Sequence, residues 1–257
     1  MAARPSSLGL ARDLSLALDP VGVLAAAGLQ PDGWQSEFLR LRPQRALLCC
    51  CRQAGKSVTT AAAALHEALY RPGALILMLA PSQRQSAELL RKTRDLLNRL
   101  GSTASDNEST LSLTLTNGSR IVSLPGKEAT IRGFSDVDLL AIDEAARVDE
   151  DLYTAVRPML AVSGGRLVAL STPYGQRGWF YQAWQSSEPW HRTLVTAHDC
   201  PRISADFLAE ERRTISPLVF ASEYECRFTD AADSAFSHDQ VMAALDHTLT
   251  PLYPEGW

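Results

Sequence analysis

The sequence predicts an α/β protein whose mainly parallel sheet is covered by helices on both faces. Short apolar runs of strand length recur along the chain, and segments of helical composition alternate with them. This alternation is typical of consecutive strand–helix units, which pack into parallel sheets. The chain has 257 residues, of which 46% are hydrophobic and 21% charged, so it is long enough to bury one large core. One α/β domain with appendages is the simplest organisation.

Composition limits the possible function classes. The net charge of −4 does not predict a generally basic surface, so any contact with nucleic acid has to be local. No run of about 18 apolar residues occurs, and residues 1–9 lack the apolar core of a secretion signal. We therefore expect a soluble, intracellular protein without a membrane segment.

Three of the five cysteines, Cys49, Cys50 and Cys51, are consecutive. They fall in a predicted strand, where neighbouring side chains point to opposite faces of the sheet. That geometry suits neither one metal ion nor a disulfide framework. We interpret them as small buried apolar side chains.

The predicted elements begin after a loose N-terminal start. A short helix is expected over residues 19–27, with Asp19 as its cap and Pro20 at its first position. The apolar runs predict strands at residues 46–51, 74–82, 138–144, 166–172 and 191–198. Helical composition predicts helices over residues 56–70, 83–100, 150–160 and 178–187, with two or three more after residue 204. Ser82 is expected to cap the second of these helices, which stops at Gly101.

The segment "TLSLTLTNGSRIVSL" predicts an antiparallel hairpin, because it alternates with period two on both sides of Asn117-Gly118. A tip at these two residues pairs Leu113 with Val122, and Leu111 with Leu124, on one apolar face. For the whole chain we expect an N-terminal helical lead-in (1–30), a core (31–200) and a C-terminal helical subdomain or linker (201–257).

The strongest local pattern is "CRQAGKS", which follows the first buried strand. It ends like a phosphate-binding loop, although the consensus places glycine where Cys50 stands. Such a loop directs backbone N–H groups and a helix N-terminus at a β-phosphate. Lys56 would reach the β- and γ-phosphates, and the hydroxyl of Ser57 would bind Mg²⁺. The alternative is an ordinary strand–turn–helix with an exposed lysine.

A second pattern places two acids at a strand end. "DLLAIDE" delivers Asp143 and Glu144 where ligands gather in open α/β sheets. In phosphate-loop enzymes the first acid holds Mg²⁺ and the second orients or deprotonates the attacking water. The alternative is a cap for the following helix. The two patterns together predict nucleotide hydrolysis.

Further positions fit a hydrolytic site, and each has a plain alternative. Gln35 can read an adenine edge with its donor and acceptor groups, or it is a surface glutamine. Arg52, in the loop, can reach a γ-phosphate, and Arg132, beside a glycine, can serve as an arginine finger; both can also be surface arginines. Ser171 and Thr172, after the fourth strand, can sense the γ-phosphate or form an ordinary turn.

The ordered set Gln35, "CRQAGKS", "IRG", "LLAIDEAA" and "LSTP" resembles the large terminase subunits of tailed bacteriophages, which package DNA into a prohead. The loop that lacks its first glycine is similar to the terminase form. The run "FASEYECRF" (220–228) is similar to the segment that ends the terminase ATPase domain. The resemblance covers residues 30–236, and it implies a RecA/ASCE-like P-loop NTPase fold.

The resemblance also implies roles for individual residues. Glu144 would be the catalytic carboxylate, Arg52 the loop arginine, and Arg132 the finger offered to a neighbouring subunit. Asp143 and Ser57 would hold Mg²⁺. ATP would contact residues in the loop and around it, namely Gln35, Arg52, Gln53, Ala54, Gly55, Lys56, Ser57, Ser171 and Thr172. The implied partners are double-stranded DNA, further copies in a ring (commonly a pentamer), the portal protein and the small terminase subunit, in the cytoplasm of the bacterial host.

Two departures from the family pattern stand out. Large terminases carry a C-terminal nuclease domain, whose two-metal chemistry needs a cluster of acids, and we expect no nuclease activity from this chain. The hairpin strand "TLSLTLT" contains no basic residue for gripping DNA. The best basic candidate is the helix over 83–100, with Arg84, Arg91, Lys92, Arg94 and Arg99, or these residues form a solvated face.

Other function classes stay open at this point. A superfamily-2-like helicase or remodeller uses similar motifs, but it needs a second RecA-like domain, for which we expect no room here. A non-catalytic module that docks on a portal or small subunit is disfavoured by the lysine and both acids. A small-molecule kinase is disfavoured by Glu144 beside Asp143, which suits water as the acceptor.

Overall fold

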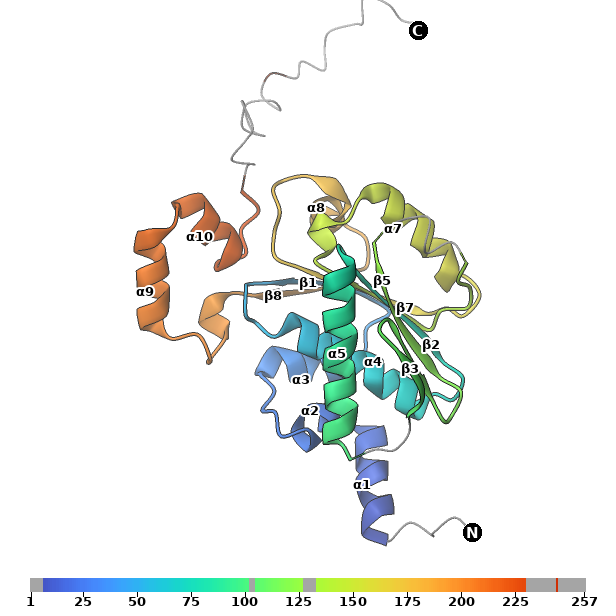
Figure 1. Ribbon diagram of the computed structural model, residues 1–257. Coiled ribbons are helices and arrows are strands. Elements are labelled where there is room, and N and C mark those ends of the chain that lie inside the picture. Colours follow the sequence, from blue (N-terminus) through green and yellow to red (C-terminus); the bar gives the residue numbers. More distant parts are fainter. Residues whose placement is uncertain (1–6, 102–104, 127–132, 230–243, 245–257) are drawn as a thin grey trace, which may run out of the picture.

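The core of the fold is a single sheet. The computed structural model describes residues 7–101, 105–126, 133–229 and 244. In this part of the chain the strand order is β3-β4-β5-β2-β6-β7-β1-β8 (Figure 1). The neighbours from β5 to β8 pair in parallel, whereas β3, β4 and β5 pair antiparallel. The strands are β1 (Arg45–Cys50), β2 (Leu75–Ala80), β3 (Ser105–Ser109), β4 (Ser112–Leu115), β5 (Arg120–Pro125), β6 (Leu139–Asp143), β7 (Arg166–Ser171) and β8 (His191–Val195). The predicted fold class is confirmed.

Helices cover both faces of this sheet (Figure 1). Side chains of the central strands alternate between two hydrophobic clusters, as the period of a strand requires. On β2, Ile76 and Met78 join the cluster that contains α4 (Lys56–Tyr70) and α5 (Gln83–Arg99). Their neighbours Leu77 and Leu79 join the cluster on the opposite face, which contains α7 (Glu150–Val156) and α8 (Gly178–Gln185). The core is therefore double-sided, which explains the continuous apolar runs of the strands.

Most predicted helices are present at the predicted places. α4 has the predicted limits, and α5 begins after Ser82, whose side chain accepts a hydrogen bond from the backbone N–H of Gln85. The helix predicted over 150–160 is divided into α7 and the 3-10 helix η2 (Arg157–Leu160). Pro158 lies at this division, because it has no N–H to continue the α-helical hydrogen bonds.

The N-terminal segment is more helical than predicted. α1 (Ser7–Leu18) occupies the expected loose start, and α3 (Gly33–Leu41) precedes β1. The helix predicted over 19–27 is shorter and begins later, as α2 (Gly22–Ala26). Oδ1 of Asp19 accepts a hydrogen bond from the N–H of Val21 at 3.1 Å, so Asp19 caps the turn before the helix.

The predicted hairpin is present, but its register differs by one residue. Leu113 pairs with Ile121 and not with Val122, because the connection has three residues instead of two. The N–H of Leu115 donates to the carbonyl of Ser119 at 2.8 Å, and Gly118 takes a φ of 84° at the end of the loop. This is the three-residue hairpin geometry with a left-handed glycine. β3 adds another antiparallel strand at this edge, which the sequence pattern did not predict.

The chain leaves the sheet through β8 and a helical segment. The 3-10 helix η3 (Ala197–Asp199) is followed by α9 (Ala205–Thr214) and α10 (Pro217–Glu223), which lie beside the end of β8 (Figure 1). These helices agree with the prediction for the segment after residue 204. Across the described residues, none of the helices combines the length and apolar character needed to cross a bilayer.

The consecutive cysteines are buried with free thiols, as predicted. Cys49 and Cys50 belong to β1, and Cys51 follows it. Sγ of Cys51 lies 3.8 Å from Sγ of Cys200, and Cys226 packs near Cys49. Burial helps to raise the pKa of the Cys50 thiol, so it behaves as an apolar group.

Candidate active site

The segment between β1 and α4 forms a tight loop at the carboxyl edge of the sheet. Gly55 directly precedes α4 and has a φ of 92°, in the left-handed region that favours glycine. A Cβ atom there would lie 2.8 Å from Nε2 of Gln35 and 3.3 Å from Nη2 of Arg202. Gln53 also has a positive φ, of 61°. The loop is thus wound closely against its neighbours, and it ends where the N-terminal N–H groups of α4 have no intrahelical partner.

Lys56 folds back onto this loop. Its Nζ donates hydrogen bonds to the carbonyl oxygens of Cys50 at 3.1 Å and Cys51 at 3.0 Å. The residue is only 8% exposed, so the alternative of an exposed lysine is wrong. Because the ammonium group lies beside the N-terminus of α4, two sources of positive potential meet at one place.

Ser57 and Asp143 meet across the sheet edge. The hydroxyl of Ser57 donates to Oδ2 of Asp143 at 3.1 Å, and Oδ1 of Asp143 accepts from the N–H of Glu144 at 3.1 Å. Burial raises the pKa of Asp143, while nearby Lys56 opposes this shift. A hydroxyl and a carboxylate from distant parts of the chain therefore converge, and oxygen donors of this kind are those that Mg²⁺ prefers.

Glu144 follows β6 in a left-handed conformation, with a φ of 51°. Such strain in a residue other than glycine is often found at functional sites. Glu144 precedes the 3-10 helix η1 (Ala145–Arg147) without a side-chain capping bond, so the structure does not support the capping alternative. Burial raises the pKa of its carboxyl, which Lys56 opposes. Nε of Arg147 lies 4.0 Å from Oε2 of Glu144.

Ser171 and Thr172 lie between the loop and the acid pair, because β7 separates β1 from β6 in the sheet. Both residues are buried. The hydroxyl of Ser171 accepts a hydrogen bond from the N–H of Ala146 at 3.1 Å, and Ser171 pairs with Cys49 in the parallel register of β1 and β7. The segment is therefore tied to both neighbouring motifs, which an ordinary surface turn would not be.

Gln35 is a buried residue, 2% exposed, so it is not a surface glutamine. Its Nε2 donates to Oγ1 of Thr59 at 2.7 Å and lies 3.5 Å from the carbonyl oxygen of Gly55, while Oε1 accepts from the N–H of Asp32 at 2.8 Å. Both amide protons are thus directed into the protein. What remains for a ligand is accepting capacity on Oε1.

The remaining loop residues differ in their surroundings. Arg52 has a side chain that is 68% exposed, and its Nε lies 3.7 Å from Oε2 of Glu223. Ala54 is buried, and its carbonyl oxygen accepts from Nη2 of Arg202 at 3.2 Å. Arg132 lies outside the described residues, so its role as an arginine finger stays a prediction.

Two cavities flank the loop. One, of about 600 Å³, is lined by Gln35, Gly55, Arg202 and residues that precede α3. The other, of about 700 Å³, is lined by Arg52, Gln53 and residues of the C-terminal helices. A ligand held by the loop would have space on both sides.

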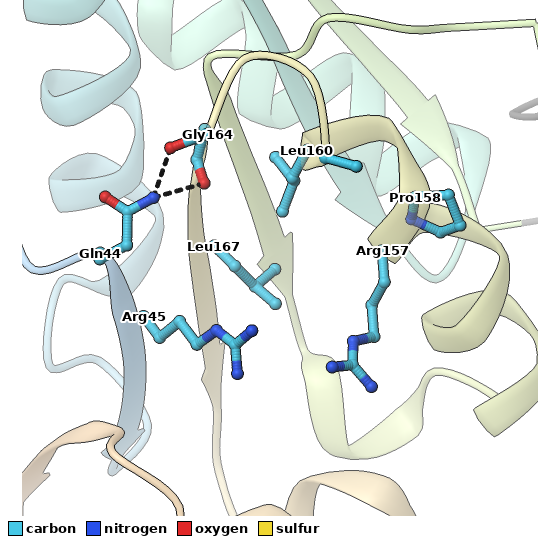
Figure 2. Close-up of a pocket in the computed structure, with 9 residues that line it drawn as sticks. Gln44, Arg45, Arg157, Pro158, Leu160, Gly164 and Leu167 are labelled. Atoms are coloured by element: carbon cyan, nitrogen blue, oxygen red, sulfur yellow. Dashed lines mark hydrogen bonds between the residues drawn. The ribbon is translucent and has the colours of Figure 1, made fainter.

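A further cavity, of about 480 Å³, is remote from the motifs (Figure 2). It includes Arg45 at the start of β1 and Leu167 near the start of β7, hence the amino edge of the sheet. Figure 2 shows Gln44 bonded to the loop at Gly164, with Arg157 on the opposite wall. Since none of the predicted site residues lines it, we do not assign the active site to this cavity.

Sequence reasoning missed three charged residues near the site. Arg202 donates to Oδ1 of Asp32 at 2.6 Å and lines both cavities beside the loop. Arg147 and Glu223 form an ion pair at 3.8 Å next to Glu144. No local sequence signal marks these residues, because folding alone brings them to the loop.

The basic side chains of α5 are largely engaged with the protein. Arg91 forms ion pairs with Glu88 at 2.7 Å and Asp95 at 2.8 Å. Arg94 and Arg99 donate to backbone carbonyl groups of neighbouring segments. A DNA-contacting role for this helix stays a prediction.

The fold and the convergence of these motifs define a class of protein, the RecA/ASCE-like P-loop NTPases. Residues 48–242 match the family model described as "Terminase large subunit, T4likevirus-type, N-terminal". The chain therefore belongs to this family of large terminase subunits, and the resemblance found in the sequence is confirmed.

Relatives and solved structures agree with this assignment. The large terminase subunit of Escherichia phage T5 is 26% identical over 239 residues, covering 88% of this chain and 53% of that protein. The large terminase ATPase domain of Thermus phage P74-26 has a TM-score of 0.72 at 21% identity, covering 89% of this chain and 100% of that one. The large terminase from a thermophilic bacteriophage, in complex with ADP, has a TM-score of 0.62 at 15% identity, covering 82% and 53%. The chain spans about half the length of the curated relatives it matches.

Proposed function

We propose that this chain hydrolyses ATP to power the translocation of double-stranded DNA into a viral prohead. The observation that carries the proposal is the convergence of Lys56, Ser57, Asp143 and Glu144 at one sheet edge, in a member of the large terminase family. The active chain would work as a homo-oligomeric ring, such as a pentamer, on the portal protein with the small terminase subunit. The compartment would be the cytoplasm of the bacterial host.

The residues present fit a Mg²⁺–ATP complex. The donor set that meets at 3.1 Å, a serine hydroxyl and an aspartate carboxylate, consists of oxygen atoms and so suits a hard cation. Ser57 and Asp143 would hold Mg²⁺, which when bound neutralises charge on the β- and γ-phosphates. Lys56 would exchange its two carbonyl partners for phosphate oxygens, since a charge-assisted bond to phosphate is the stronger one.

Glu144 would orient the attacking water and accept its proton. The raised pKa of this carboxyl, caused by burial, makes it a better base than an exposed glutamate. Ser171 and Thr172 would report the state of the γ-phosphate, because the Ser171 hydroxyl is bonded to the backbone two residues after Glu144. Arg52 would contact the γ-phosphate from the same subunit, and Arg132 would serve the site of a neighbouring subunit.

The cavity beside Gln35 would receive the adenine. Both protons of the Gln35 amide are already directed to Thr59 and Gly55, so Gln35 would act as an acceptor for the exocyclic amino group of adenine. This arrangement favours adenine over guanine, which carries an oxygen at the corresponding position.

The proposal is tested by Mg²⁺-dependent ATP hydrolysis as a function of protein concentration, with and without linear duplex DNA. We expect the rate per subunit to rise with concentration, and Glu144→Gln to lower kcat by at least about 100-fold. Glu150→Gln, an exposed acid in the first turn of α7, is the matched control and should leave the rate unchanged. Equal rates for Glu144→Gln and the wild type would refute the assignment.

The finger in trans has its own test. Arg132→Ala and Lys56→Ala subunits should each be inactive alone, whereas their mixture should regain activity because one supplies the finger and the other the loop. A mixture of Arg132→Ala with the double variant should remain inactive. Wild-type turnover by Arg132→Ala alone under assembling conditions would contradict the role.

A further inference from the structure

The C-terminus of α10 contacts the phosphate loop and the segment after β7. The N–H of Arg52 donates to the carbonyl oxygen of Glu223 at 2.9 Å. The hydroxyl of Ser222 donates to the carbonyl oxygen of Pro173 at 3.1 Å. This helix end is therefore fixed between the two motifs that would surround a γ-phosphate.

The carboxylate of Glu223 lies between two guanidinium groups. Its Oε2 is 3.7 Å from Nε of Arg52, and its Oε1 is 3.8 Å from Nη2 of Arg147. Both distances are ion-pair distances but exceed those of good hydrogen bonds. Glu223 is only 18% exposed, whereas Arg52 is 68% exposed and so free to take another partner. Ion pairs with this geometry and exposure are weak and easily exchanged.

We propose that Glu223 is a positioning residue that holds Arg52 until the γ-phosphate of a bound nucleoside triphosphate takes its place. The inference rests on the proposed function, since it requires nucleotide in the loop. A γ-phosphate carries more charge than a carboxylate and offers more acceptor oxygens, so it displaces Glu223 from the guanidinium. A nucleoside diphosphate has no γ-phosphate and leaves the pair of Glu223 and Arg52 intact.

One consequence can be measured. Because Glu223 competes with the γ-phosphate for Arg52, it weakens the binding of triphosphate but not of diphosphate. Glu225 provides the matched control on the same segment. Its carboxylate pairs with Arg212 at 2.5 Å and Arg227 at 3.3 Å, and neither of these residues belongs to the motifs.

The experiment measures the affinity of the 257-residue chain for a non-hydrolysable ATP analogue and for ADP, both with Mg²⁺, by calorimetry. Glu223→Gln should bind the triphosphate about three- to fivefold more tightly, the range expected for losing one partly exposed ion pair. Its affinity for ADP should stay within about twofold of the wild type. Glu225→Gln should change neither affinity. In an Arg52→Gln background, adding Glu223→Gln should have no further effect on the triphosphate.

The outcomes separate the two proposals. Equal changes for triphosphate and diphosphate, no change for either, or an effect that survives in the Arg52→Gln background would each overturn the role of Glu223 while the proposed function stands. Wild-type protein that binds neither nucleotide, and that behaves like Lys56→Ala, would overturn the proposed function itself.

Discussion

Gly55 is the residue on which the shape of the loop depends most directly. Its φ of 92° is strained for any other L-residue, and a Cβ atom would come within 2.8 Å of the buried Gln35 amide. That amide is held by three partners, so it has little freedom to move away. The GKS pattern is therefore a requirement of local geometry as well as of phosphate chemistry.

We expect Gly55→Ala to destabilise the fold by about 1–2 kcal/mol, because alanine is strained at this φ and the Cβ displaces Gln35. Urea denaturation measures the free energy of unfolding. Gly33→Ala is the matched control, since Gly33 begins α3 with nothing within 4 Å of its Cβ position. A loss in Gly33→Ala as large as that in Gly55→Ala would contradict the explanation.

Glu67 is a buried carboxylate on α4 with three arginine partners. It is 4% exposed, and its oxygens lie 2.7 Å from Arg42, 3.5 Å from Arg166 and 3.7 Å from Arg71. Burial lowers the pKa of Arg166 to about 10, which nearby Glu67 opposes. Since Arg166 is only 12% exposed, its charge depends on Glu67 for compensation.

Removing this carboxylate leaves a buried guanidinium without its counter-charge. We expect Glu67→Ala to lower the free energy of unfolding by about 3 kcal/mol. The control is Arg40→Ala, which breaks the exposed ion pair with Asp19 and should cost less than about 1 kcal/mol. Similar losses for the two variants, measured by denaturant unfolding, would contradict the prediction.

At the scale of elements, periodicity and turn chemistry predicted most of the architecture. α4 has the limits that its apolar pattern and the following Pro72-Gly73 indicated, because both signals are local. The hairpin register was wrong by one residue, because Asn117-Gly118 is compatible with both two-residue and three-residue connections. The choice depends on the parallel pairing of β5 with β2, a contact distant in sequence.

α1 was missed because its stability comes from tertiary contacts. Only a few of its residues are shielded from solvent, and short isolated helices are marginal in water. Two hydrogen bonds attach it to α4, one between Nε2 of His66 and the carbonyl of Leu16 at 3.1 Å, and one between Tyr70 and Asp13 at 3.0 Å.

The contact of α1 with α4 should depend on pH. Burial lowers the pKa of His66 below its ordinary value, so the folded state favours neutral imidazole. As pH falls below about 6.5, the unfolded state binds the proton more readily and stability decreases. We expect His66→Gln to flatten the dependence of unfolding free energy on pH between about 5.5 and 7.5. A variant with the wild-type slope would exclude His66 as the source.

At the scale of the whole molecule, nucleotide binding should stabilise the fold, because its site joins segments distant in sequence. At a ligand concentration about 100 times Kd, Mg²⁺–ATP analogue should contribute about 2.7 kcal/mol. For a chain of this size we expect Tm to rise by about 5–10 °C in a thermal shift experiment. Lys56→Ala should abolish the shift, and a shift that persists in this variant would place the nucleotide elsewhere.

The sequence by itself determined the order of strands and helices, the fold class and the family. It also indicated which residues have the chemistry for phosphate and Mg²⁺. These features depend on hydrophobic period, helix caps and motif spacing, all of which are local in the chain.

Only the tertiary structure decided how those residues meet. The position of β7 between β1 and β6 ties Ser171 to the backbone just beyond Glu144, and the packing of α10 brings Glu223 to Arg52. Folding also commits the Gln35 amide protons to the protein interior, which limits what this residue offers a ligand. Strand order and helix docking follow from the burial of apolar faces that lie far apart in sequence, and no local pattern records that choice.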